Sequence, residues 1–200
     1  MNTVSSVQKP DRTSPKDVLL TVMEGPRVLS FSYTGIMNYH GGAMPAGVAL
    51  AFRLFEHLFS VYENRFHTPP GRGEASFFSG LGENGQGILD TADILLRIRK
   101  YHALLDEPVI PAAFPAPEAP GGGSYYFSGT LGEMTWAAAL RGGLVSPVFF
   151  NASREMHRKK DARLPVTDRE IQNLQQLRQN TEKALLSLSP EEIFQFMIGV

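Results

Sequence analysis

The sequence predicts an α+β fold, in which an antiparallel or mixed sheet packs against helices and the chain closes with a helical C-terminal tail. Residues 45–62 carry apolar side chains at steps of three and four, the period of a long core helix. One strand-like segment precedes a helical pattern at 88–99, several follow it, and helical periodicity returns after residue 167. Because strands and helices fall in separate runs, α+β is favoured over alternating βαβ units.

The chain of 200 residues is long enough for one domain with a buried core. Residues 1–13 are polar and are expected to form a flexible N-terminal arm. Residues 14–160 are expected to form the α+β core, and residues 161–200 to form C-terminal helices that pack on it.

The first helix is expected at Ser14-Pro15-Lys16-Asp17, which combines a capping serine, a proline at the first helical position and an early acidic residue. Residues 18–23 would give it a short apolar face, and Gly25-Pro26 would end it. Residues 28–37 alternate loosely, and their pattern leaves strand and helix both open.

The core helix is expected to begin at Pro45, since proline suits a first helical turn. It follows a glycine-rich turn, residues 39–44, that carries His40. The first turn of a helix has free backbone N–H groups and the positive end of the helix dipole. The sequence therefore predicts a polar site beside His40.

The middle of the chain alternates between apolar segments and glycine- or proline-rich ones. Residues 75–79 predict a strand, 80–87 a glycine-rich turn, and 88–99 a helix with one apolar face. Residues 108–123 are rich in Pro, Ala and Gly and are expected to form an exposed loop. A further strand is expected at 124–128.

Residues 135–140 and 144–150 flank Arg141-Gly142-Gly143, a pattern typical of a β-hairpin. The basic run at 154–163 is interpreted as a solvated link. Thr167 and Glu170 form a capping box before a long helix. A second helix start at residues 189–192 predicts a last helix that runs on through the apolar residues after it.

Composition excludes several classes of protein. The formal net charge of −1 gives no basic footprint for nucleic acid. The absence of cysteine removes disulfides, thiolate nucleophiles and cysteine-based metal sites. No apolar run approaches the roughly 20 residues of a membrane span, and the N-terminus lacks a basic-then-apolar leader. No nucleic-acid or membrane partner is expected, and the expected location is cytoplasmic.

Residues 80–85 match G-x-G-x-x-G after a strand-like run and before a helix, the fingerprint of dinucleotide binding. A Rossmann unit should continue into a next strand that carries an acidic residue. Here the chain passes from Leu104 to Pro108 into the proline-rich loop instead. The context therefore argues against a dinucleotide site.

Four short segments resemble, in collinear order from Tyr39 to Val200, the FmdE-like family of formylmethanofuran dehydrogenase subunits and their relatives. The first resembles that family's His-Gly-His-x-Cys-Pro-Gly turn, with His40, Gly41 and Pro45 matching and Gly47 one residue late. Residues 83–90 resemble its Glu-Asn-x-x-Cys-x-x-Asp segment, residues 128–132 its Gly-x-Thr-x-Gly turn, and residues 190–194 its closing helix. The chain ends without the cysteine-rich zinc module that some members add.

The resemblance implies a site for a divalent metal such as zinc, or for a small cofactor. His40 would be the metal ligand, while Gly42 and Met44 stand in place of the second histidine and the cysteine, and Gly87 in place of the other cysteine. The implied cofactor-binding residues are Gly41, Gly42, Glu83, Asn84, Asp90 and Thr130. Catalytic residues are not indicated.

Each of these residues also has an ordinary structural interpretation. His40 could be a buried histidine bonded to backbone, and Met44 could fill space. Glu83 could cap its own loop, Asp90 could complement a helix dipole, and Thr130 could be a turn residue.

Three functions are compatible with these observations. The resemblance implies an accessory protein that binds a metal or small cofactor, related to a subunit of molybdenum or tungsten formylmethanofuran dehydrogenase and so to methanogenic one-carbon metabolism. The alternatives are a small anionic-ligand-binding protein on the same scaffold, or a dimeric structural or interaction protein with no active site. A homodimer is the expected assembly, and a small molecule the expected ligand.

Overall fold

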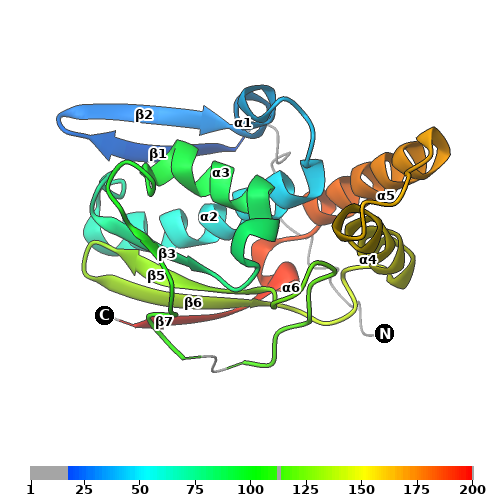
Figure 1. Cartoon of the computed structure of the whole chain (residues 1–200). Helices are drawn as coiled ribbons and strands as arrows, with labels where there is room; N and C mark the ends of the chain where they lie inside the picture. Colours follow the sequence, from blue (N-terminus) through cyan, green and yellow to red (C-terminus); the bar gives the residue numbers. More distant parts are fainter. Residues whose placement is uncertain (1–17, 112–113, 200) are drawn as a thin grey trace, which may run out of the picture.

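The computed structural model describes residues 18–111 and 114–199 (Figure 1). The predicted α+β class is confirmed: helices pack against a five-stranded mixed sheet, and a two-stranded hairpin lies apart from it. The expected arm at 1–13 and helix start at 14–17 lie outside the described residues. No helix in the described ranges is long and apolar enough to cross a membrane.

The main sheet has the strand order β4-β3-β5-β6-β7. Only β3 and β4 run parallel, and the other neighbours pair antiparallel. The strands are β3 (Ala75–Ser79), β4 (Leu104–Leu105), β5 (Tyr126–Leu131), β6 (Met134–Leu140) and β7 (Phe194–Gly199). The predicted strands at 75–79 and 124–128 thus correspond to β3 and β5.

Helix α2 (Pro45–Phe66) is the predicted core helix, and 12 of its 22 residues are buried. Proline stands at its start, and His67, in the left-handed region at φ 57°, ends it. Figure 1 shows α2 and α3 (Gln86–Leu96) between the sheet and the hairpin. The largest fully buried side chains include Phe52, Phe55, Phe77, Phe127, Trp136 and Phe194. Burial of each such ring contributes about 1.5–3 kcal/mol.

The prediction of a helix at residues 18–24 is wrong. This segment is strand β1 (Leu19–Glu24), which forms a hairpin with β2 (Arg27–Ser32). Leu20 and Val22 are buried while Leu19 is exposed, which is the two-residue period of a strand. Gly25, at φ 58°, supplies the positive φ of the turn, so Gly25-Pro26 joins two strands instead of ending a helix.

The sequence pattern of residues 28–37 fitted either a strand or a helix. In the structure, residues 28–32 belong to a strand and residues 33–37 to a helix. Strand β2 ends at Ser32, whose side chain accepts a hydrogen bond from the Gly35 N–H and caps α1 (Tyr33–His40). Helix α1 ends at Gly41 in the left-handed region.

The hairpin expected at 135–150 is also wrong. Strand β6 pairs with β5 and β7, and residues after Ser146 form helix α4 (Pro147–Asp161). Ser146 accepts from the Phe149 N–H, and Pro147 takes the first helical position, so a serine–proline pair starts a helix here. The basic run at 154–163, interpreted as a link, lies mainly within α4.

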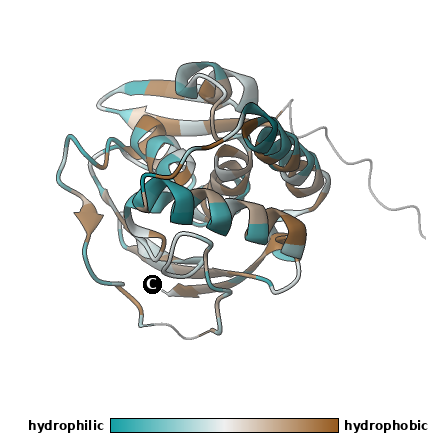
Figure 2. Ribbon diagram, turned by 45° about the vertical axis from the view of Figure 1, so that its right-hand side comes forward, coloured by the Kyte–Doolittle hydropathy of each residue, from teal (hydrophilic) through white to brown (hydrophobic). Residues whose placement is uncertain are grey.

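The predicted capping box at Thr167 and Glu170 is confirmed and opens α5 (Asp168–Ser187). The helical tail continues in α6 (Pro190–Ile193), but the residues after it form β7 instead of extending the helix. The last strand pairs with β6 along its whole length, for example Ala138 with Phe196. Figure 2 shows mainly hydrophilic residues on α4 and α5, the helices that come forward in that view.

The proline-rich loop expected to be exposed covers part of the outer face of the sheet. Ile110, Phe114 and Ala116 pack against Tyr126 and its neighbours on β6. The Tyr126 hydroxyl donates to the Ile110 carbonyl over 2.7 Å. The loop therefore closes a second, smaller apolar cluster.

Helices α2 and α3 approach closely where Gly47 faces Gly87. A Cβ added at Gly47 would lie 3.2 Å from the Gly87 Cα, and a Cβ added at Gly87 would lie 3.0 Å from the Met44 carbonyl oxygen. These neighbours are backbone atoms, which cannot rotate away. The start of α3 can thus lie against the start of α2 only because both positions lack a side chain.

The exchange Gly87→Ala is expected to lower the free energy of unfolding by about 1–3 kcal/mol, the usual cost of overpacking. Alanine inside a helix would otherwise add about 0.5–1 kcal/mol relative to glycine. Guanidinium denaturation of Gly87→Ala and of Gly142→Ala, where an added Cβ meets nothing within 4 Å, measures the difference. A variant at Gly87 as stable as wild type would contradict the close contact.

Candidate functional site

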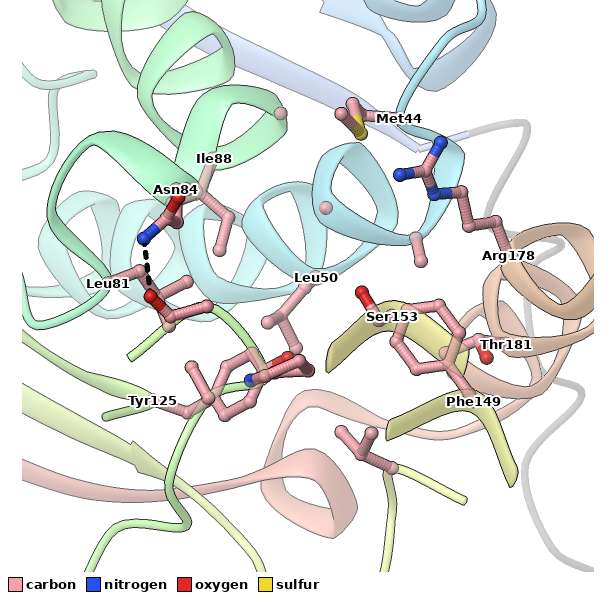
Figure 3. A pocket seen from close by; sticks show the side chains of 18 of the residues that line it. Met44, Leu50, Leu81, Asn84, Ile88, Tyr125, Phe149, Ser153, Arg178 and Thr181 are labelled. Carbon is pink, nitrogen blue, oxygen red and sulfur yellow. Dashed lines mark hydrogen bonds between the residues drawn. The ribbon is translucent and has the colours of Figure 1, made fainter. Parts of the chain in front are cut away.

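A cavity of roughly 140 Å³ opens beside the start of α2 (Figure 3). Its walls come from the starts of α2 and α3, the short 3-10 helix η1 (Gly82–Gly85), the loop at 119–125, the end of β6 and helices α4 and α5. The apolar lining includes Met44, Leu50, Leu81, Ile88, Leu140, Val145, Phe149 and Leu185. The polar lining consists of Asn84, Tyr125, Ser153, His157, Arg178 and Thr181.

The α2 end of the cavity is electropositive. Met44 is the N-cap of α2 and makes no side-chain capping bond, so the first-turn N–H groups have no side-chain acceptor. Ala46 and Gly47, in that first turn, line the cavity. The positive end of the α2 dipole therefore faces this space.

Arg178, from α5, adds a full charge at the same end. Its Nη1 donates to the Ala43 carbonyl over a long 3.4 Å. In the part of the chain that the structure describes, Arg178 forms no ion pair with a carboxylate. Burial lowers the pKa of its guanidinium, but an arginine stays charged in proteins. Most of its N–H donors are thus available to an anion.

The opposite end of the cavity carries the polar side chains of Asn84, His157 and Tyr125. Asn84 Nδ2 donates to the Gly121 carbonyl over 2.7 Å, and Figure 3 shows this bond across the cavity from Arg178. His157 Nδ1 lies 2.9 Å from the Ser153 carbonyl. Burial raises the pKa of the nearby Tyr125 hydroxyl, which keeps it protonated.

Helix α4 faces the cavity with its two buried residues, Phe149 and Ser153. The rest of its surface is polar, and four of its residues between Arg154 and Lys160 are basic. The helix also contacts α5, where Lys159 pairs with Glu170 over 2.5 Å.

His40 and Asp90 are brought together, but neither residue lines the cavity. His40 Nε2 lies 3.2 Å from Asp90 Oδ2, an ion-pair distance without hydrogen-bond geometry, and the imidazole is only 6 % exposed. The other carboxylate oxygen, Asp90 Oδ1, accepts from Arg99 Nη2 over 2.7 Å. The three side chains join the end of α1 to α3.

This donor set does not fit a metal centre. A zinc site needs at least three protein ligands, and His40 and Asp90 supply two, one of which is engaged by Arg99. Among the described residues, no group of three or more His, Cys, Asp or Glu side chains is placed to hold a metal ion. The expected divalent metal at His40 stays a prediction.

The other residues expected at a cofactor site are dispersed. Gly41 and Gly42 end α1, and their N–H groups donate to the carbonyls of Asn38 and Met37. Thr130 lies within β5 and bonds to Ser76 across the strand pair. Glu83 is exposed in η1. Of the predicted residues, only Asn84 lines the cavity.

The G-x-G-x-x-G segment forms η1 between β3 and α3. A strand, β4, does follow α3 and runs parallel to β3, but it pairs at only two positions. A Cβ added at Gly80 would meet the carbonyl oxygens of Ser124 and Tyr126 at 2.7 and 2.9 Å. Gly80 therefore allows two segments of the protein's own backbone to come close together. In a dinucleotide site, the glycines of this motif instead let the backbone approach a pyrophosphate.

Arg178 and His157 were not predicted from the sequence. One pattern could have indicated Arg178: it stands four residues after Leu174 and seven before Leu185, on the buried stripe of α5. A charge on an apolar stripe predicts a buried site or ion pair. His157 shows no such pattern, since it lies within a run of basic residues.

A scan against models of known protein families finds no match to this chain, and a search of curated proteins finds no similar sequence.

His40→Ala is expected to lower the free energy of unfolding by about 1–3 kcal/mol, because it removes a buried ring and one partner of the Asp90 carboxylate. The neighbouring exchange Tyr39→Ala, at a side chain that is 78 % exposed, should change stability by less than about 0.5 kcal/mol. Thermal unfolding of both variants, with and without a chelator, measures this. A chelator that lowers wild-type stability to that of His40→Ala would show a bound metal instead.

Proposed function

We propose that this protein binds a small anionic ligand with an apolar body, in the cavity between α2, α3, α4 and α5. The observation that carries the proposal is Arg178, a partly buried guanidinium that lacks a carboxylate partner among the described residues and lies at the electropositive end of an apolar cavity. A buried charge without a partner is costly, so such a residue is typical of a site that an anion completes.

The shape of the site favours a carboxylate on a compact hydrocarbon. A dry cavity of about 150 Å³ holds one benzene molecule, and this cavity is of similar size. Arginine binds carboxylates through two parallel hydrogen bonds. An aryl or short alkyl carboxylate would place its charge on Arg178 and its body among Leu50, Ile88 and Phe149.

The accessory-protein hypothesis remains a second candidate, and one observation favours it. The positions that resemble the FmdE-like signature meet in space: His40 lies beside Asp90, and a Cβ added at Gly87 would lie 3.1 Å from the Met44 Cβ. Met44 and Gly87, which stand where the family has cysteine, also line the cavity. The closeness of these positions supports a scaffold shared with that family and a ligand-binding role for this cavity. Homodimer formation stays a prediction.

Arg178→Gln is expected to weaken benzoate binding by about 1.5–3 kcal/mol, the contribution of hydrogen bonds to a charged group. Isothermal titration calorimetry of wild type against benzoate and its neutral analogue benzamide measures the effect. Benzamide should bind more weakly than benzoate to wild type and almost equally to wild type and variant.

The matched control is Arg169→Gln, an exposed arginine on the same helix that does not line the cavity. It should bind benzoate as wild type does. Equal loss in both variants would mean that the effect is general electrostatics, and would contradict a site at Arg178.

A further inference from the structure

The end of the cavity opposite Arg178 has its own chemistry. A Cβ added at Gly121 would lie 3.0 Å from Asn84 Nδ2 and 3.1 Å from His157 Nε2. The amide and the imidazole therefore meet at one point of the cavity wall, where only a glycine leaves room between them. Both line the cavity, and both come from elements far apart in the sequence.

The hydrogen bonds of these two side chains fix which of their atoms remain available. The Ser153 carbonyl can only accept, so His157 Nδ1 is the donor of this bond, and the tautomer with its proton on Nδ1 offers Nε2 as an acceptor. The Gly121 carbonyl likewise selects the amide nitrogen of Asn84, which leaves Asn84 Oδ1 as an acceptor. Neither acceptor has a hydrogen-bond partner among the described residues.

An acceptor in the cavity wall recognises a donor, and the other residues of the lining indicate which kind of donor. A ligand ammonium group would favour an acidic side chain, and no Asp or Glu is among the residues that line this cavity. A neutral hydroxyl can donate to His157 Nε2 without an added charge. The adjacent Tyr125 hydroxyl, kept protonated by burial, can donate in return.

We infer that the ligand is a hydroxy acid: a carboxylate on Arg178, a compact apolar body, and a hydroxyl group that donates at the His157–Asn84 end. The inference rests on the proposed function, since it assumes that an anion occupies the Arg178 end. It adds that His157 determines specificity, because a site built to bond a hydroxyl discriminates against an analogue that lacks it.

The test compares para-hydroxybenzoate with para-methylbenzoate, in which a methyl group of similar size replaces the hydroxyl. Calorimetric titration of wild type should show about five- to tenfold tighter binding of the hydroxy compound, the effect of one hydrogen bond. In His157→Phe this ratio should fall to about one. His157→Gln should restore part of the ratio, because its amide oxygen accepts a hydrogen bond.

Arg178→Gln provides the control at the other end. It should weaken binding of both compounds by the same factor and leave their ratio unchanged. If His157→Phe does not fold, the same titration is made with Asn84→Ala, which removes the amide that bounds the same point of the cavity wall and should also lower the ratio.

The results separate the inference from the function on which it rests. Benzoate binding with no preference for the hydroxy compound would overturn the hydroxy-acid inference and leave the anion site intact. A preference that persists in His157→Phe and in Asn84→Ala would overturn it as well. Absence of binding by all three aryl carboxylates at millimolar concentration would overturn both proposals.

Discussion

The contact between Gly47 and Gly87 is the constraint on which the arrangement of the site depends. It allows the starts of α2 and α3 to lie against each other at backbone distance, with 3.2 Å between a Cβ added at Gly47 and the Gly87 Cα. A side chain at either position would separate the helices and displace η1. The same contact brings Asn84, on η1, to the edge of the space at the N-terminus of α2. The close contact between α2 and α3 thus places Gly47, Gly87 and Asn84 side by side in the wall of the cavity.

Two polar connections hold α5 in the position that directs Arg178 into this cavity. Arg53, buried in α2, donates to the Leu186 carbonyl and pairs with Glu56. Tyr33 donates to Glu182 over 2.7 Å, and burial together with this carboxylate raises the pKa of the tyrosine hydroxyl. Partners of this kind make a buried polar group favourable, whereas Arg178 has only a long bond to a carbonyl. This contrast between Arg53 on α2 and Arg178 on α5 is the reason for proposing a ligand at Arg178 and a structural role for Arg53.

Sequence patterns predicted those elements that local interactions determine. The apolar period of α2 and the capping box at Thr167 are complete within a few turns of chain, and both elements form where expected. The sequence predictions failed for segments whose secondary structure depends on pairing or packing with residues far away in the chain. Strand β7 follows a good helix start, yet it is held by its ladder to β6, which residues 194–199 cannot reveal by themselves. The serine–proline pair before α4 fits either a strand edge or a helix cap, and only the packing of Phe149 separates the two.

The site was less predictable than the fold because its polar residues come from three separate parts of the chain. Asn84 was among the residues that the resemblance implied, but Arg178 and His157 reach the cavity through the packing of α4 and α5, which no motif encodes. The resemblance directed attention to His40, whose imidazole is buried against Asp90 with Arg99 on the other side. That arrangement satisfies the carboxylate within the protein and braces α1 on α3. No carboxylate pairs with Arg178 among the described residues, and this difference is why the proposed ligand is placed at Arg178 and not at His40.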